Sequence, residues 1–225
     1  MISSIPKIAI SQRIVTNSTY HEVRDCLSQE WPSWVTATFP GAVMVPIPNA
    51  PMMIPCWWNE LKPDALILSG GNNIGDRPLR DKTEAVALRI ARGQGLPILG
   101  ICRGLQLLAK ELGETIETEI RCKTGENHIA QDHPVIVEAV PELGIQVPMS
   151  IEVNSFHEQG VIASDIKSQG LVFATSIGGV VEGIYHDRYK MLGLQWHPER
   201  TCPDEEFNKL ILENFFKGTR LEVEK

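Results

Sequence analysis

Cys102 lies in the run Gly-Ile-Cys-Arg-Gly-Leu-Gln (100–106), which joins an apolar, strand-like segment to a helical pattern. A sharp turn from a strand into a helix lifts the central side chain out of the sheet, and the glycines remove the Cβ atoms that would clash there. The positive end of the helix favours a thiolate, and the backbone N–H of Arg103 is free to bind an oxyanion. The pattern favours a nucleophilic Cys102 over a buried structural cysteine.

A cysteine nucleophile needs a base and an acid that orients the base. Among the six histidines, His197 follows the apolar run 191–196 and precedes Pro-Glu. In an extended His-Pro-Glu, the first and third side chains point the same way, so Glu199 can hold the imidazole in one tautomer. We therefore expect His197 to be the base and Glu199 its orienting acid; the alternative is a surface histidine beside a helix-capping acid.

A second oxyanion donor is predicted in the run Ser-Gly-Gly-Asn (69–72), which ends another apolar strand. Ligands gather at the carboxyl ends of parallel strands. Two glycines there allow the N–H of Gly71 to turn toward the ligand, beside that of Arg103. The alternative is a plain Gly-Gly turn.

Apolar runs alternate with helical patterns through the first half of the chain, which predicts a parallel sheet covered on both faces. The second half shows short strand patterns and a final helix. We expect one α/β domain over residues 1–218, with antiparallel additions in its C-terminal half, and a polar tail at 219–225. The predicted strands are 7–11, 42–46, 64–69, 97–101, 135–140, 149–153, 171–175, 180–185 and 191–196, the helices are 20–35, 80–94, 103–112 and 204–217, and 48–58 is a loop.

The composition narrows the class of partner. The 225 residues carry a formal net charge of −7, which argues against nucleic acid or an anionic membrane as the main partner. There is no apolar run long enough to span a membrane and no signal-peptide pattern, so we expect a cytoplasmic protein. Five cysteines without a C-x-x-C spacing suggest neither a disulfide framework nor a zinc cage. His128 and His133 match no strong metal-ligand spacing, and we expect them in a solvated loop.

Four segments follow one another along the chain: the Ser-Gly-Gly turn, the cysteine run, Val-Asn-Ser-Phe-His-Glu-Gln-Gly (153–160) and Leu-Gly-Leu-Gln-Trp-His-Pro-Glu (192–199). Together they resemble the class I glutamine amidotransferases and, within them, the γ-glutamyl-γ-aminobutyrate hydrolase branch. The resemblance implies a flavodoxin-like fold and a Cys-His-Glu triad that cleaves a small-molecule γ-glutamyl amide through a thioester, with no metal or organic cofactor. By position it implies the triad Cys102, His197 and Glu199, oxyanion donors at Gly71 and Arg103, and substrate contacts at Gly70, Gln106, Asn154, Ser155 and His157.

Two departures from the family pattern leave the amine half of the substrate open. The segment 72–79 is short, and the segment after Asn154 and Ser155 reads Phe-His-Glu-Gln (156–159), where relatives often carry a second histidine. The candidates are γ-glutamyl-γ-aminobutyrate and a nucleotide-linked phosphoramidate, since compact members similar to this chain hydrolyse a γ-glutamyl-CDP-amidate in capsule modification. Arg77, Arg80 or Lys82 would suit such an anion. The favoured alternative is that Arg80 and Lys82 form ion pairs with Glu84 and Asp81 on the helix surface.

Three classes of function remain in view. The first is a free-standing γ-glutamyl hydrolase, and the second is a glutaminase subunit that supplies ammonia to a separate synthetase. The third, a non-catalytic binding protein on this fold, is disfavoured because Cys102, His197 and Glu199 are all present. Co-purification of a synthetase and basal glutaminase activity would separate the first two. Whether the chain forms a homodimer stays open.

Overall fold

The computed structural model describes residues 5–168 and 171–222, so the end of the predicted tail, 223–225, lies outside the described residues. The strands are β1 (Lys7–Ile10), β2 (Arg13–Asn17), β3 (Glu22–Cys26), β4 (Val43–Pro46), β5 (Ala65–Leu68), β6 (Ile98–Ile101), β7 (Ile129–Val137), β8 (Met149–Phe156), β9 (Val172–Ser176), β10 (Val181–His186) and β11 (Met191–Leu194). The α-helices are α1 (Glu30–Thr38), α2 (Ile54–Leu61), α3 (Pro78–Gly93), α4 (Arg103–Glu111), α5 (Ile120–Thr124) and α6 (Glu205–Phe216).

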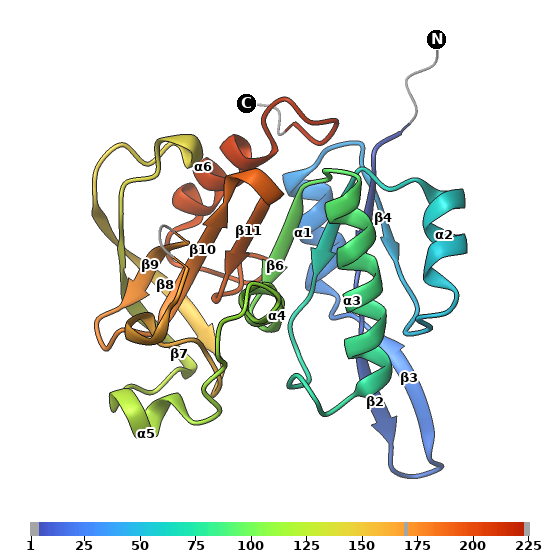
Figure 1. Cartoon of the computed structure of the whole chain (residues 1–225), viewed down its shortest axis with the longest axis horizontal. Coiled ribbons are helices and arrows are strands. Elements are labelled where there is room, and N and C mark those ends of the chain that lie inside the picture. The colour runs from blue at the N-terminus through green and yellow to red at the C-terminus, as the bar shows by residue number, and fades with distance from the viewer. Residues whose placement is uncertain (1–4, 169–170, 223–225) are drawn as a thin grey trace.

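In the described part of the chain, nine strands form one sheet in the order β4-β1-β5-β6-β11-β10-β9-β7-β8 (Figure 1). The pairs from β4 to β11 are parallel, and those from β11 to β8 are antiparallel. The predicted α/β class, with antiparallel strands added in the C-terminal half, is confirmed. The order places the carboxyl ends of β5, β6 and β11 side by side, which is where the motifs of the sequence lie.

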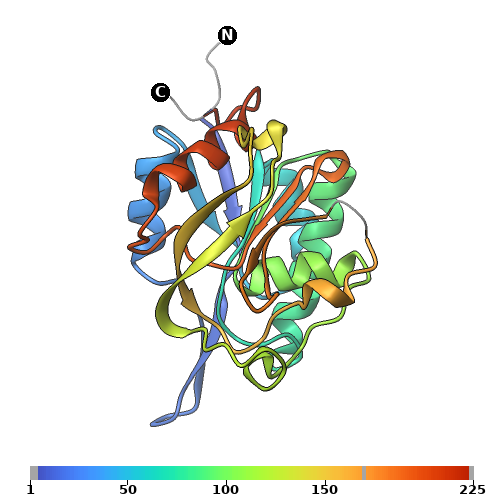
Figure 2. The same cartoon turned by 90° about the vertical axis from the view of Figure 1, so that its left-hand side faces the viewer.

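Helices cover both faces of the sheet, as predicted (Figures 1 and 2). Side chains of α1 and α6 pack on one face, with Ile8 and Ile10 of β1. Those of α2, α3 and α4 pack on the other, with Ala9 of the same strand. The alternation along β1 follows from the period of two residues in a strand. Among the described helices, none is both long and apolar enough to cross a membrane.

The prediction of one helix at 20–35 is wrong for the first part of that range. Strands β2 and β3 form a two-stranded hairpin that extends away from the main sheet (Figure 2), and α1 begins only at Glu30. Val23, inside the range predicted as helix, is 63% exposed on this hairpin. Pro32 lies in the first turn of α1, where its missing N–H costs little, and so it starts a helix rather than ending one.

Two smaller differences concern the loop and the tail. The predicted loop at 48–58 contains the start of α2, whose first turn holds Pro55. In the segment predicted as a polar tail, Leu221 is buried in the core. An apolar side chain that packs in this way belongs to the domain, since its burial removes apolar surface from water.

Candidate active site

Cys102 occupies the turn between β6 and α4 in a backbone conformation that side-chain-bearing residues rarely adopt, with φ 54° and ψ −106°. Its N–H donates to Leu194 O at 2.7 Å, which ties the turn to the end of β11. A positive φ at a residue with a side chain is strained, and such strain is typical of functional turns. The sulfur is thereby presented at the start of α4, whose first N–H groups have no partners within the helix.

The flanking glycines are needed because α4 lies very close to the sheet. A Cβ on Gly104 would lie 2.2 Å from Leu68 O, and one on Gly100 would lie 2.6 Å from the backbone of Gly104. Both distances are shorter than any real contact, so a side chain at either position would push the helix off β5 and β6. The spacing of glycines around Cys102 therefore reflects helix-on-strand contact, as the sequence predicts.

His197 and Glu199 form a close pair just beyond β11. His197 Nδ1 lies 2.7 Å from Glu199 Oε1, and both side chains are almost fully buried. His197 Nε2 makes no hydrogen bond in the described residues, which leaves it available on the side of Cys102. Gly70 lies between them, because a Cβ there would be 3.1 Å from His197 Cε1 and 3.5 Å from Cys102 Cβ.

The opposite charges of the Cys102 thiolate and the His197 imidazolium stabilise each other. Burial disfavours the thiolate, but the positive charge of His197 outweighs burial and lowers the pKa of the Cys102 thiol. Burial also disfavours an imidazolium, but the negative charges of Cys102 and Glu199 raise the pKa of His197 to about 9. Each group therefore favours the charged form of the other.

The loop after β5 is held by a buried arginine that the sequence analysis placed at the surface. Arg80 is fully buried, and its guanidinium donates to Ser69 O at 2.6 Å, Gly70 O at 3.1 Å and Gly71 O at 2.6 Å. In a trans peptide the C=O and the following N–H point in opposite directions. With Gly70 C=O facing Arg80, the N–H of Gly71 points to the opposite side, where Gly71 lines the pocket beside Cys102.

Arg80 is neither a surface residue nor a ligand for an anion. Its Nε donates to Glu84 at 2.9 Å, and the same carboxylate accepts a hydrogen bond from Arg103. The pairing of Arg80 with Glu84 is as predicted, but both side chains are fully buried rather than exposed. Arg77 and Lys82 do not line the pocket around Cys102. None of the three basic residues of this segment therefore faces that pocket.

A pocket of about 250 Å³ opens over Cys102. Besides Cys102, four of its lining residues are predicted site residues: Gly71, Arg103, Gln106 and His157. Gln106 Nε2 donates to Gln159 O at 2.8 Å, which fixes its amide at the wall of the pocket. The remaining lining residues are Asn72, Asn73, Ile129, Phe156, Glu158 and Gln159.

Asn154 and Ser155, predicted to contact substrate, do not line this pocket. The Asn154 amide accepts from His197 N–H at 2.8 Å and donates to His197 O at 2.9 Å, so it holds the backbone of His197 in place. Ser155 donates to His128 O at 2.9 Å. Both side chains are buried and already bonded, because they sit on β8 facing the interior rather than in a loop.

The structure also brings Arg13 against the loop after β5, a contact that the sequence did not predict. Asn72 bonds both backbone groups of Ile14, at 2.8 and 3.0 Å, and so fastens the start of β2 to the loop after β5. The Arg13 guanidinium then lies against Gly71, with its Nε 2.7 Å from where a Cβ would be. It forms no ion pair with the described residues. No motif in the sequence marks this cation, since its approach depends on tertiary contacts.

The prediction that His128 and His133 lie in a solvated loop is wrong. His128 is 2% exposed, and the side chain of His133 is 11% exposed. Both face the buried Glu182 of β10, together with His157. The one signal in the sequence was Glu182 itself, a charged residue inside the apolar run of β10.

The fold and the arrangement of these residues define a class. A glutamine amidotransferase from Thermotoga maritima superposes with a TM-score of 0.61 over 87% of this chain and 77% of that one, at 17% identity, which shows a shared fold. The sheet with its cysteine turn therefore has the fold of that protein. The sequence model of the family described as Peptidase C26 matches residues 6–199, and the chain belongs to this family.

Two relatives resemble the chain over most of its length. The glutamine amidotransferase-like protein YvdE of Lactococcus lactis is 34% identical over 179 residues, which cover 69% of this chain and 74% of that protein. The γ-glutamyl-CDP-amidate hydrolase of Campylobacter jejuni is 28% identical over 200 residues, 86% of this chain and 90% of that protein. The chain is thus a member of a glutamine amidotransferase-like hydrolase family.

Proposed function

We propose that this protein hydrolyses a γ-glutamyl amide through a γ-glutamyl thioester on Cys102, with His197 as acid and base and Glu199 as its orienting group. The observation that carries the proposal is the strained turn that presents Cys102 to a buried His197–Glu199 pair under an open pocket. Membership of the Peptidase C26 family supports it.

The proposed steps balance in protons and bonds. The Cys102 thiolate adds to the γ-carbonyl carbon, and the N–H groups of Gly71 and Arg103 bind the oxyanion. The imidazolium of His197 gives its proton to the departing nitrogen, and the C–N bond breaks. Neutral His197 then takes a proton from water, which attacks the thioester, and the C–S bond breaks to release glutamate and regenerate the thiolate.

We further propose that the leaving group is anionic. Arg13 supports this, because its guanidinium lies against Gly71, a residue that lines the pocket, and forms no ion pair with the described residues. Arginine binds phosphate oxygens with two parallel hydrogen bonds. The name of the Campylobacter jejuni relative, a γ-glutamyl-CDP-amidate hydrolase, also favours a nucleotide-linked phosphoramidate as the leaving group.

A substrate panel tests this assignment: glutamine, γ-glutamyl-γ-aminobutyrate and a nucleotide-linked γ-glutamyl phosphoramidate. We expect the highest kcat/KM for the phosphoramidate. Arg13→Gln should raise its KM by about tenfold or more, the value of one charge-assisted hydrogen bond, while glutamine is affected less. Arg77→Gln, a matched change away from Gly71, should leave kcat and KM unchanged for all three substrates.

Two outcomes of the panel contradict the anionic leaving group. Equal rates across the three compounds would leave a generic γ-glutamyl amide hydrolase. An Arg13→Gln effect that is the same for every substrate would make Arg13 a structural residue. A preference for glutamine, together with co-purification of a synthetase, would favour the glutaminase-subunit alternative.

Arg80 is expected to act as a positioning residue for the oxyanion amide of Gly71. Arg80→Lys keeps the charge, but one ammonium group cannot reach Glu84 and three carbonyl oxygens in the geometry of the guanidinium. Because loss of one oxyanion donor costs about 10²–10³ in kcat, we expect a fall in kcat of at least about tenfold. The alkylation rate of Cys102 by iodoacetamide should stay unchanged, since the thiolate does not depend on this loop.

The matched control is Arg89→Lys, on the exposed side of the same helix, which should leave kcat unchanged. If Arg80→Lys lowers turnover and the alkylation rate together, Arg80 supports the whole fold rather than the oxyanion amide. Normal turnover in Arg80→Lys would also contradict the positioning role.

A further inference from the structure

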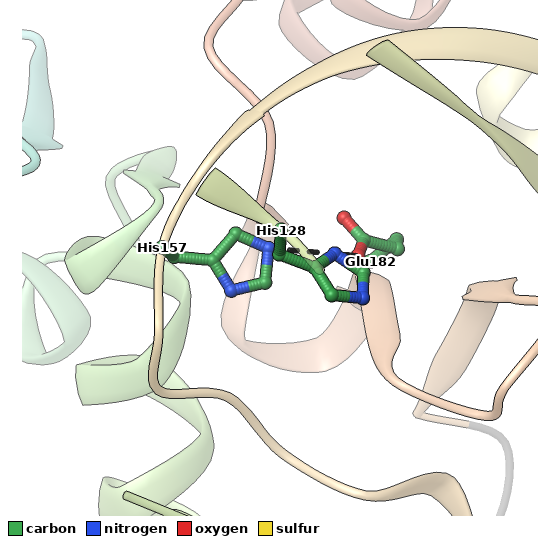
Figure 3. A group of neighbouring side chains, drawn as sticks. All are labelled: His128, His157 and Glu182. Atoms are coloured by element: carbon green, nitrogen blue, oxygen red, sulfur yellow. Dashed lines mark ion pairs between the residues drawn. The ribbon is translucent and has the colours of Figure 1, made fainter. Parts of the chain in front are cut away.

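A buried carboxylate beside the active-site pocket is surrounded by three imidazoles. Glu182 Oε1 lies 3.4 Å from His128 Nδ1, 3.6 Å from His133 Nε2 and 3.7 Å from His157 Nε2. Figure 3 shows His128 and His157 converging on Glu182. The ligand-capable atoms of these three residues all lie within 4.8 Å of one another, and all three side chains are buried. His133, whose Nε2 faces the same carboxylate, is a fourth candidate ligand.

The four groups come from different parts of the fold. Glu182 belongs to β10, His128 directly precedes β7, His133 lies within β7, and His157 directly follows β8. Their spacing in the sequence matches no compact ligand motif, which is why the sequence analysis predicted no metal. Only the antiparallel part of the sheet brings them together.

The outer nitrogen of each imidazole faces a hydrogen-bond acceptor. His157 Nδ1 donates to Gln159 O at 2.9 Å, and His133 Nδ1 donates to Pro134 O at 3.2 Å. His128 Nε2 lies 3.2 Å from the carboxylate of Glu126. Because carbonyl and carboxylate oxygens only accept, each outer nitrogen carries a proton. When a ring is neutral, its inner nitrogen, which faces Glu182, presents a lone pair.

This arrangement leaves buried acceptors without donors. Both carboxylate oxygens of Glu182, and the inner nitrogens of His133 and His157, have no hydrogen-bond partner in the described residues, although Glu182 is completely buried. A buried, unpaired carboxylate is costly. A cation at the centre of the four groups would pair Glu182 Oε1 and the inner nitrogens of His133 and His157.

We propose that His128, His133, His157 and Glu182 form a binding site for a divalent transition-metal ion, with Zn²⁺ as the best fit. Imidazole and carboxylate ligands suit Zn²⁺ in a closed tetrahedral site. With ligand bonds of about 2.0–2.1 Å, tetrahedral geometry puts neighbouring ligand atoms roughly 3.3 Å apart. The three distances from Glu182 Oε1 to the imidazole nitrogens, 3.4–3.7 Å, are a few tenths longer. The ligand atoms of His128, His157 and Glu182 lie within 4.8 Å of one another, so the side chains would move inward on binding an ion.

The outer partners fit the same interpretation. Histidines that bind metals usually donate their other N–H to a carboxylate or a backbone carbonyl, which fixes the tautomer and the ring. Glu126 is itself held, because it accepts from Ser176 Oγ at 2.5 Å and from Gly178 N–H at 2.7 Å. Each histidine that would bind the ion is therefore held by a hydrogen-bond acceptor, and one of these acceptors, Glu126, is itself held by hydrogen bonds.

The site would bear on the active-site pocket through His157, which lines that pocket. A bound ion would fasten the end of β8 to β7 and β10 and so fix the wall of the pocket opposite Gly71. The ion takes no part in the proposed steps at Cys102, and the metal site stands independently of the proposed reaction.

Metal analysis of the purified full chain tests the proposal. The protein is stripped with a chelator, dialysed against a small excess of Zn²⁺ and then against metal-free buffer. We expect about one Zn²⁺ per chain, and a higher Tm with Zn²⁺ than without it. Co²⁺ in place of Zn²⁺ should give the intense visible bands of a tetrahedral site. Glu182→Gln, which keeps the shape of the side chain, should lower retained Zn²⁺ at least fivefold and abolish the Tm shift.

Three control variants make the outcome decisive. His133→Asn, a smaller disturbance of a partly exposed ligand, should also lose Zn²⁺ while circular dichroism shows the native fold. Cys102→Ser and His21→Asn, which lie outside the cluster, should keep one ion per chain. Less than about 0.1 Zn²⁺ per wild-type chain, or Zn²⁺ retained equally by Glu182→Gln and His133→Asn, would overturn the proposal.

Discussion

Replacing Cys102 with serine is expected to lower kcat for a γ-glutamyl amide by at least about 10⁴-fold, since single changes at the nucleophile of comparable triads cost that much or more. The thiol pKa at this turn is lowered by His197, whereas a hydroxyl stays protonated at neutral pH. Steady-state turnover of wild type and variant measures the effect. Cys202→Ser, a matched change at another buried cysteine, should leave turnover unchanged.

Alkylation provides an independent check on the nucleophile. Iodoacetamide should label Cys102 first and inactivate the enzyme in proportion, because the thiolate is the reactive form. Cys122 is exposed, but a hydrogen bond to Glu119 raises its thiol pKa, so it should react more slowly. Loss of activity that follows labelling of a different cysteine would contradict the assignment.

His197→Ala is expected to lower kcat/KM by at least about 10³-fold, because both the proton donor and the base are removed. Removing the imidazole also removes the main influence that lowers the pKa of Cys102. The pH profile of Cys102 alkylation should therefore move to higher pH, and alkylation at neutral pH should become slower.

Glu199→Gln should have a smaller effect than His197→Ala, since it removes the orientation of the ring and not the base itself. The loss of the carboxylate also lowers the pKa of His197 from about 9, so the alkaline limb of the rate profile should shift to lower pH. His186→Ala, a histidine outside the site, serves as the matched control. Near-normal rates in either His197→Ala or Glu199→Gln would refute the triad.

Local sequence patterns predicted the parts of the site that depend on local geometry. The cysteine turn and the His-Pro-Glu pair each lie within a few residues, and the close approach of Gly104 to Leu68 explains why the turn is recognisable. The strands near these motifs were found because they are buried on both faces and so are continuously apolar.

Features that depend on tertiary contacts could not be predicted in this way. Arg80 looked like a surface ion pair because its sequence neighbours are charged, but it lies under three carbonyl groups of the loop after β5. The hairpin of β2 and β3 carries apolar residues at helical spacing, and only its two-stranded pairing makes it a hairpin. The histidines around Glu182 come from β7 and its start and from the end of β8, and no spacing in the sequence reveals that these segments meet at β10.

The most direct test of the central claim is the mass of the enzyme during turnover. Wild-type protein is mixed with the γ-glutamyl substrate that it turns over fastest, quenched in acid and analysed by peptide mass spectrometry. The mechanism predicts a γ-glutamyl adduct on the peptide that contains Cys102, present during turnover and absent once substrate is exhausted. Rapid turnover with no adduct on any residue at any quench time, or an adduct on another residue that persists in Cys102→Ser, would contradict it.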